Sequence, residues 1–209
     1  STFGAHVSAA PHAQTLRNTP LSTRGNVSFF GDLGYELDLK HLLPIEEKEI
    51  THQVDFYKKY RRVFQFGEFS RLYAPEGVAW QVSGGNTHIA GLFHKLVTAA
   101  PGYEQLRLQG LKPESRYQMV SREQLLRVGQ FGGLVKHIAP VALDPNGFVL
   151  RTADRLYPMN DGVLTMEASG SALMSGVMLN ARFAGTGYDS GGRNQGDFCS
   201  NVYAVQEMK

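Results

Sequence analysis

The sequence contains a single cysteine, Cys199, so no disulfide can form within the chain. This scarcity is typical of a reducing compartment, and we expect a cytoplasmic location. No apolar run reaches the roughly 18 residues that a membrane-spanning helix needs, so no membrane partner is expected. Residues Ser1–His6 lack the basic and apolar segments of a secretory signal, and the chain lacks a starting Met. We therefore expect that it begins inside a longer open reading frame or was processed.

An excess of charge is also lacking. Lys and Arg together number 21 and Asp and Glu number 19, which gives a formal net charge of +2. This balance provides no electrostatic reason to expect nucleic acid as a partner. Hydrophobic residues make up 42% of the chain, which is enough for a packed core and excludes global disorder.

The motifs of common catalytic and metal sites are missing. The sequence has no Cys-x-x-Cys, no His-Glu-x-x-His, no Gly-x-Ser-x-Gly and no P-loop. His88 and His94 lie six positions apart in one apolar run, too far along a strand to share a metal ion. We expect neither a metal nor a cofactor. The Gly-rich stretch Gly185–Arg193 lacks the following helix that would hold a phosphate, so we interpret it as a surface loop.

The first third of the chain has an α/β pattern. Thr2–Ser8 and Val27–Phe30 are short apolar runs typical of buried parallel strands, and a turn-rich segment, Gly31–Glu36, follows the second run. A helix is predicted from Pro44, with an apolar stripe that includes Ile50 and Val54. Its early carboxylates, Glu46, Glu47 and Glu49, favour a solvated face near the positive end of the helix dipole.

From about Gly67 the apolar period changes to two, which is typical of antiparallel strands. We predict all-β structure, most simply an antiparallel β-sandwich, with a domain boundary near Phe66 that separates residues 1–66 from 67–209. The predicted strands are Trp80–Val82, His88–Thr98, Leu106–Leu108, Tyr117–Met119, Phe148–Leu150 and Phe198–Tyr203. A short helix is expected at Ser121–Val128 and an irregular apolar segment at Ser171–Met178.

Two buried strands cannot form a stable parallel sheet alone, because ladder groups would stay unpaired and apolar faces would stay wet. We therefore expect the first 65 or so residues to complete a sheet that is supplied by another part of the protein.

Two places carry candidate site residues. His6 and Ser8 end the first predicted strand, while Asp32, Glu36 and Asp38 follow the second. In a β/α barrel the loops at the C-terminal ends of the strands build the active site. His6 could bind a substrate hydroxyl or be a satisfied barrel residue, and the carboxylates could equally serve turns or caps.

Several stretches, as an ordered set, resemble family 36 of the glycoside hydrolases, the bacterial α-galactosidases. They cover nearly the whole chain and include Gly4–Ala9, Gln14–Leu21, Arg24–Val27, Gly31–Asp38, Phe56–Arg61, Gly170–Gly176 and Gly196–Tyr203. The resemblance implies a parent with an N-terminal β-sandwich, a (β/α)8 TIM barrel and a C-terminal antiparallel domain. This chain would hold the end of the barrel and that last domain.

The resemblance also implies a retaining mechanism with two Asp residues, whose Lys-Trp-Asp and acid/base motifs do not occur here. We therefore expect no catalytic residue in this chain and name His6, Ser8 and Asp32 as substrate-proximal candidates. The expected partners are an α-galactoside oligosaccharide, the remainder of the catalytic barrel and, in a homo-oligomer, further copies of the chain.

Two alternatives stay open at this point. A non-catalytic carbohydrate-binding or interaction module would show exposed aromatics on one sheet face. A related α-N-acetylgalactosaminidase or a galactosyltransferase would keep the barrel and change the reaction or the sugar.

Overall fold

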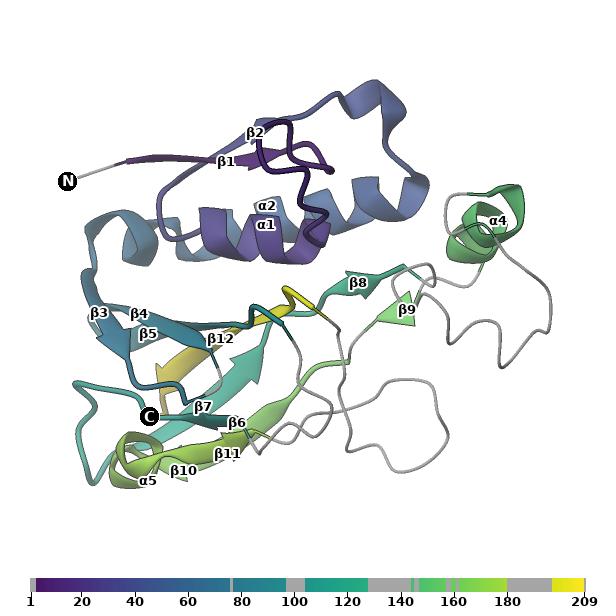
Figure 1. The fold of residues 1–209 in the computed structure, drawn as a ribbon. Helices are drawn as coiled ribbons and strands as arrows, with labels where there is room; N and C mark the ends of the chain where they lie inside the picture. The colour runs from purple at the N-terminus through teal and green to yellow at the C-terminus, as the bar shows by residue number, and fades with distance from the viewer. Residues whose placement is uncertain are drawn as a thin grey trace.

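The computed structural model describes residues 3–75, 77–96, 104–127, 144, 147–156, 159–160, 162–179 and 197–208. These residues form four layers (Figure 1): a parallel strand pair, two helices, a six-stranded antiparallel sheet and a two-stranded sheet. Within the described ranges, no helix combines the length and the apolarity needed to span a bilayer.

A β-α-β unit supplies the strand pair in the upper part of Figure 1 and one of the two helices beneath it. It comprises β1 (Gly4–Ser8), α1 (Leu21–Ser28) and β2 (Asp32–Glu36), and the two strands pair in parallel, with Gly4 opposite Asp32 and Ser8 opposite Glu36. The expected first strand is confirmed. A parallel pair with a helix between its strands agrees with the predicted α/β character of this part.

The prediction of a strand at Val27–Phe30 is wrong, because this run ends helix α1 and leads into the turn before β2. A short apolar run cannot be assigned to helix or strand from periodicity alone. The second strand, β2, lies instead in Gly31–Glu36, the segment that we interpreted as turn-rich. A Cβ atom at Gly34 would lie 2.5 Å from Cδ2 of His6, so the glycine is required where the His6 side chain crosses β2.

Helix α2 (Pro44–Phe66) confirms the long predicted helix, with proline in its first turn. The carboxylate of Glu46 accepts the N–H of Leu43 at 2.9 Å, which satisfies one of the free donors at the helix start. A short 3₁₀ turn, η1 (Leu39–His41), comes between β2 and α2.

The buried face of α2 is rotated from the predicted one in its first half. Glu49 and Gln53 are buried, whereas Ile50 and Val54 are only half-buried. The predicted solvated face is therefore wrong for Glu49, because that carboxylate turns inward to an arginine from the sheet region, Arg122.

The six-stranded sheet has the order β10-β7-β12-β5-β4-β3, and all its pairs are antiparallel. Its strands are β3 (Glu68–Leu72), β4 (Val78–Gly84), β5 (Thr87–Phe93), β7 (Arg116–Ser121), β10 (Thr165–Ser169) and β12 (Ser200–Glu207). Two smaller pairs accompany it: β6 (Glu104–Leu106) with β11 (Val177–Leu179), and β8 (Leu125–Leu126) with β9 (Met159–Asn160).

Most of the predicted strands occur, but three assignments are corrected. Phe148–Leu150 opens helix α4 (Phe148–Leu156), in which Leu150 and Asp154, one turn apart, are the buried side chains. In place of the helix expected at Ser121–Val128, the described residues 121–127 contain the end of β7 followed by β8. The segment Ser171–Met178, expected to be irregular, contains most of helix α5 (Gly170–Ser175) and the start of β11.

Both faces of the six-stranded sheet are covered. One face meets β6, β11 and α5 through a core that includes Leu106, Met119, Leu173, Tyr203 and Val205. The other face meets α1 and α2 through a largely aromatic core that includes Phe29, Phe30, Tyr57, Phe64 and Val202. The helices before residue 67 thus share a core with the strands after it, and a division into 1–66 and 67–209 stays a prediction.

Candidate functional site

The parallel register of β1 and β2 brings polar side chains together at the C-terminal edge of the strand pair. His6 Nδ1 lies 3.7 Å from Glu36 Oε2, and both side chains are mostly exposed. Ser8, directly opposite Glu36, is half-buried. His6, Ser8 and Glu36 therefore form a small polar edge that is open to solvent in the described structure.

Asp32 does not join this edge. It is the first residue of β2 and pairs with Gly4, so it lies roughly 13 Å along the strand from Glu36. Its Oδ1 accepts a hydrogen bond from Nε2 of Gln65 at 3.0 Å. The prediction that Asp32 follows a strand is wrong, because the second strand begins at this residue.

Arg24 of α1 fixes the segment that leaves β1. Its Nη1 donates to the carbonyl of Ser8, and its Nε donates to the carbonyl of Thr19 at 3.1 Å. Burial lowers the pKa of Arg24, and the nearby Glu46 carboxylate opposes that shift. The side chain ties the C-terminal end of β1 to the start of α1.

Asp38, after β2, has the capping role that the sequence left open. Its Oδ1 accepts the N–H of Lys40 at 2.9 Å, and its Oδ2 lies 2.8 Å from Nδ1 of His41. The Lys40 N–H and the His41 side chain hold the pKa of Asp38 below its usual value. A carboxyl group with a lowered pKa is unsuited to act as a general acid near neutral pH.

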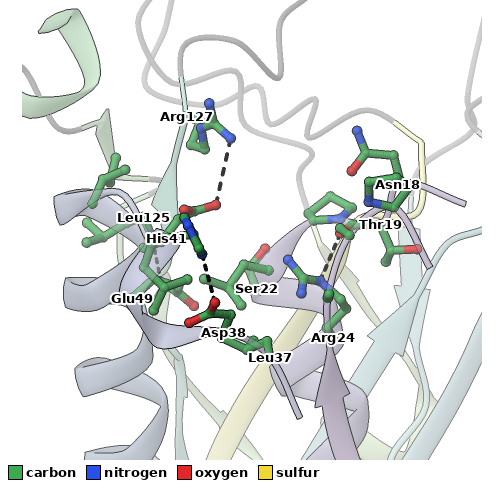
Figure 2. A pocket seen from close by; sticks show the side chains of 18 of the residues that line it. Asn18, Thr19, Ser22, Arg24, Leu37, Asp38, His41, Glu49, Leu125 and Arg127 are labelled. Atoms are coloured by element: carbon green, nitrogen blue, oxygen red, sulfur yellow. Dashed lines mark hydrogen bonds and ion pairs between the residues drawn. The ribbon is translucent and has the colours of Figure 1, made fainter. Parts of the chain in front are cut away.

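A cleft of about 630 Å³ lies beside this edge (Figure 2). The segments after β1 and β2 and the first turns of α1 and α2 form most of it, and Leu125 and Arg127 approach from the sheet side. Arg127 Nη1 lies 3.7 Å from Glu46 Oε1 across the cleft wall. The lining thus contains both cations and carboxylates, which suits a polar ligand better than a strongly charged one.

A buried ion pair, which we did not predict, joins α2 to the segment after β7. Arg122 Nη2 lies 2.8 Å from Glu49 Oε1, and the two side chains are 2% and 3% exposed. Glu49 also lines the cleft, and its Oε2 accepts the N–H of Leu125 at 2.8 Å. The sequence offered only a weak signal for it: Glu49 and Gln53, four apart, lie on one face of the predicted helix.

The remaining candidates have simpler placements. Trp80, in β4, packs against the aromatic core. Cys199 is buried, and the loop Gly185–Arg193 lies outside the described residues. In the part of the chain that the structure describes, no group of three or more His, Cys, Asp or Glu side chains could hold a metal ion.

Two protein-family models match the chain in succession. The Melibiase model matches residues 1–67, and the model of the glycosyl hydrolase family 36 C-terminal domain matches residues 78–205.

Relatives and solved structures agree with these matches. The chain is 40% identical over 148 residues to α-galactosidase AgaA of Geobacillus stearothermophilus, covering 68% of this chain and 20% of that protein. It is 37% identical over 137 residues to α-galactosidase Mel36A of Lactobacillus acidophilus, covering 64% and 18%. The chain thus spans about a fifth of the length of these curated relatives.

The crystal structure of the α-galactosidase from Lactobacillus brevis matches 99% of this chain and 22% of its own, with a TM-score of 0.67 and 29% identity. A structure of an AgaA variant in complex with raffinose matches 98% of this chain and 22% of its own, with a TM-score of 0.65 and 28% identity.

Proposed function

Because the chain belongs to family 36 of the glycosyl hydrolases, as its motifs predicted, we propose that it forms the C-terminal portion of a retaining α-galactosidase. The observation that carries the proposal is the order of the two family matches along one chain, with the Melibiase region first. The curated relatives that support it are named α-galactosidases. Their solved counterparts include complexes with raffinose and stachyose, so we propose α-galactosides of this type as substrates.

In this proposal β1, α1, β2 and α2 are the end of a (β/α)8 barrel, and the six-stranded sheet with its small partner sheet is a C-terminal sandwich-like domain. The parallel pair supports the first part, because two strands leave unpaired ladder groups on their outer edges. Further barrel strands would pair there. The C-terminal edge with His6 and Ser8 would then face the active site, as in other barrels of this kind.

The catalytic pair is proposed to lie outside this chain. A retaining glycosidase needs two carboxyl groups about 5–5.5 Å apart, one of them able to donate a proton. Three carboxylates near the edge have other partners: Asp38 caps η1, Glu46 caps α2 and Glu49 pairs with Arg122. Glu36, the carboxylate of the edge itself, lies 3.7 Å from His6. His6 and Ser8 are left as contacts for substrate hydroxyls.

The decisive assay uses the complete polypeptide encoded by the gene that contains this chain. We expect it to hydrolyse p-nitrophenyl α-galactoside and raffinose, with little turnover of the β-galactoside or of the α-N-acetylgalactosaminide. Residues 1–209 alone should show no turnover above a boiled control. A complete polypeptide that binds α-galactosides without hydrolysing them would favour the binding-module alternative and reject this proposal.

Self-association and a cytoplasmic location complete the proposal. Three exposed aromatic side chains lie at the edge of the sheet and are suited to contact another subunit: Phe66 at the end of α2, Phe69 in the edge strand β3 and Tyr73 directly after it. Sedimentation velocity should show an oligomer that Phe66→Ser and Tyr73→Ser weaken. Cell fractionation should find the activity in the cytoplasm, where the single buried Cys199 would stay reduced.

A further inference from the structure

A continuous set of buried hydrogen bonds crosses the interface between the helices and the six-stranded sheet. We call it the polar network. Its members come from α1, α2, β12 and the segment after β7, and each is less than a tenth exposed: Asn26, Glu49, Gln53, Arg122, Gln124 and Ser200. No part of the proposed catalytic function uses these residues.

Arg122 is the centre of the polar network. Its Nε donates to Oδ1 of Asn26 at 2.9 Å, its Nη1 to the carbonyl of Glu123 at 3.0 Å, and its Nη2 to Oε1 of Glu49 at 2.8 Å. A planar guanidinium holds its donors in a fixed fork, so these contacts set the relative orientation of three segments. Lysine, with a single ammonium group, cannot reproduce this geometry.

The network continues on both sides of Arg122. Toward the sheet, Nδ2 of Asn26 donates to Oγ of Ser200 at 2.8 Å and to Oε1 of Gln124 at 2.9 Å. Toward the strand pair, Nε2 of Gln53 donates to Oε1 of Glu49 at 2.9 Å, and the Tyr35 hydroxyl donates to Oε1 of Gln53 at 2.9 Å. Tyr35 is the residue before Glu36, at the C-terminal end of β2.

The polar network therefore connects the central strand β12 to the end of β2 through directional contacts only. Apolar contacts keep most of their energy when packed elements slide slightly, whereas fully formed hydrogen bonds favour one geometry. Breaking a buried pair is costly, yet such pairs often add little net stability. A network of this kind is better explained by the geometry that it fixes than by the stability that it adds.

We propose that the polar network is a positioning device. Through Glu49, Gln53 and Tyr35, the six-stranded sheet holds the C-terminal end of β2 in the geometry that the active site requires. The segment 37–43, which connects β2 to α2, is held in the same way. Arg122 is then a positioning residue that touches no substrate. The activity part of this inference rests on the proposed α-galactosidase function, whereas the geometric part does not.

The test compares Arg122→Lys with Leu173→Ala in the complete polypeptide. Leu173 is fully buried in α5, on the opposite face of the sheet, so its truncation lowers stability without touching the polar network. Arg122→Lys keeps the charge opposite Glu49 and removes the fork. We expect Arg122→Lys to lower kcat/KM for raffinose about tenfold or more at a temperature where it is folded, since small displacements at a site can cost up to ~100-fold. Leu173→Ala should lower Tm at least as much and leave kcat/KM within about twofold.

Hydrogen exchange gives a readout that is independent of activity. In the segment 37–43 the N–H groups of Lys40, His41 and Leu43 are bonded to Asp38 or Glu46, so their exchange is slow enough to follow. We expect these amides to exchange about tenfold faster in Arg122→Lys and unchanged in Leu173→Ala, as expected for local opening. If Arg122→Lys does not fold, Glu49→Gln serves in the same comparison.

Unchanged exchange in a folded network variant, or equal loss of kcat/KM in Leu173→Ala, would overturn the inference. Absence of α-galactosidase activity in the unmodified polypeptide would reject the proposed function instead, and the exchange comparison would still decide the positioning role.

Discussion

Helices α1 and α2 meet the six-stranded sheet through two adjacent regions of opposite chemistry. One is the aromatic core, in which Phe29, Phe30 and Phe64 pack with ring centroids 5.5–5.7 Å apart. The other is the polar network around Arg122, which lies toward the C-terminal edge of the strand pair. Both bury their side chains almost completely. The aromatic core is stabilised by buried apolar area, whereas the polar network is stabilised by directional hydrogen bonds.

The comparison shows how one interface can serve two requirements. Burial of apolar area stabilises the contact in proportion to its size and tolerates small shifts. Directional hydrogen bonds restrict the helices to one orientation, and an unpaired group in their midst is expensive. The polar network lies next to the candidate site, where the geometry of the side chains matters most. Mutations in the two regions should therefore separate stability from activity.

The largest effect on stability is expected from Phe29→Ala in the aromatic core. Phe29 is fully buried and contacts the rings of Phe56, Tyr57 and Phe64. Its removal should lower the free energy of unfolding by roughly 3–5 kcal/mol, measured by urea denaturation. The control Phe148→Ala, at a side chain that is 84% exposed, should cost less than about 1 kcal/mol. Equal losses for the two would contradict the contrast between core and surface.

The next effect concerns the polar network. Asn26→Ala removes the acceptor of Arg122 Nε and the donor to Ser200 and Gln124, and we expect a loss of about 1–3 kcal/mol in the free energy of unfolding. The matched control on the same helix is Ser28→Ala, since the Ser28 hydroxyl bonds only the carbonyl of Arg24 among the described contacts. That change should be close to neutral. Chemical denaturation at two wavelengths would measure both.

A smaller effect is expected where α1 crosses α2. A Cβ atom at Gly25 would lie 2.3 Å from Cδ of Gln53, whose amide is held by Glu49, Tyr35 and the carbonyl of Leu21. Gly25→Ala should displace that amide and cost about 1 kcal/mol after the gain in helix propensity. In the double variant Gly25→Ala/Gln53→Ala the two effects should not add. Additive losses would show that the helices do not meet at this point.

The smallest effect is expected on the other face of the sheet, where pH should act. Burial lowers the pKa of His88, and the Glu207 carboxylate opposes that shift. The unfolded chain then binds a proton more readily than the folded protein, so the stabilisation is complete above the unfolded pKa of roughly 6.5 and is lost as pH falls through the folded value. Urea midpoints between pH 7.5 and pH 5 should fall less steeply in His88→Gln. If the urea midpoints of His88→Gln fell as steeply with pH as those of the unmodified protein, His88 would not contribute to this pH dependence.

The sequence allowed the elements with clear periodicity to be predicted. The helix from Pro44 and the strands around Trp80, His88 and Tyr117 occur because alternating or helical apolar spacing reflects which faces are buried. The parallel character of the first part of the chain was also predictable from its short apolar runs, whereas its completion of a larger sheet stays a prediction.

The rest depended on tertiary contacts that no local pattern encodes. Strand β2 has a glycine where the His6 side chain crosses it, so its sequence resembles a turn. Glu49 lies among charged residues early in a helix and becomes buried only because Arg122, 73 positions away, turns toward it. Asp32 was predicted to follow a strand, because the sequence of β2 resembles a turn. Whether His6 and Ser8 contact a substrate stays a prediction.

The position of β12 has a consequence for the order of assembly. This strand, the last in chain order, lies between β5 and β7, and its Ser200 bonds Asn26 from 174 positions earlier. Until residues 200–207 have been synthesised, β5 and β7 cannot belong to one sheet, and Asn26 has no Ser200 to bond. Contacts of such long sequence separation form slowly, so β5, β7 and α1 remain partly exposed to solvent until β12 contacts them. Chaperone dependence during synthesis is the expected cost of placing the last strand at the centre.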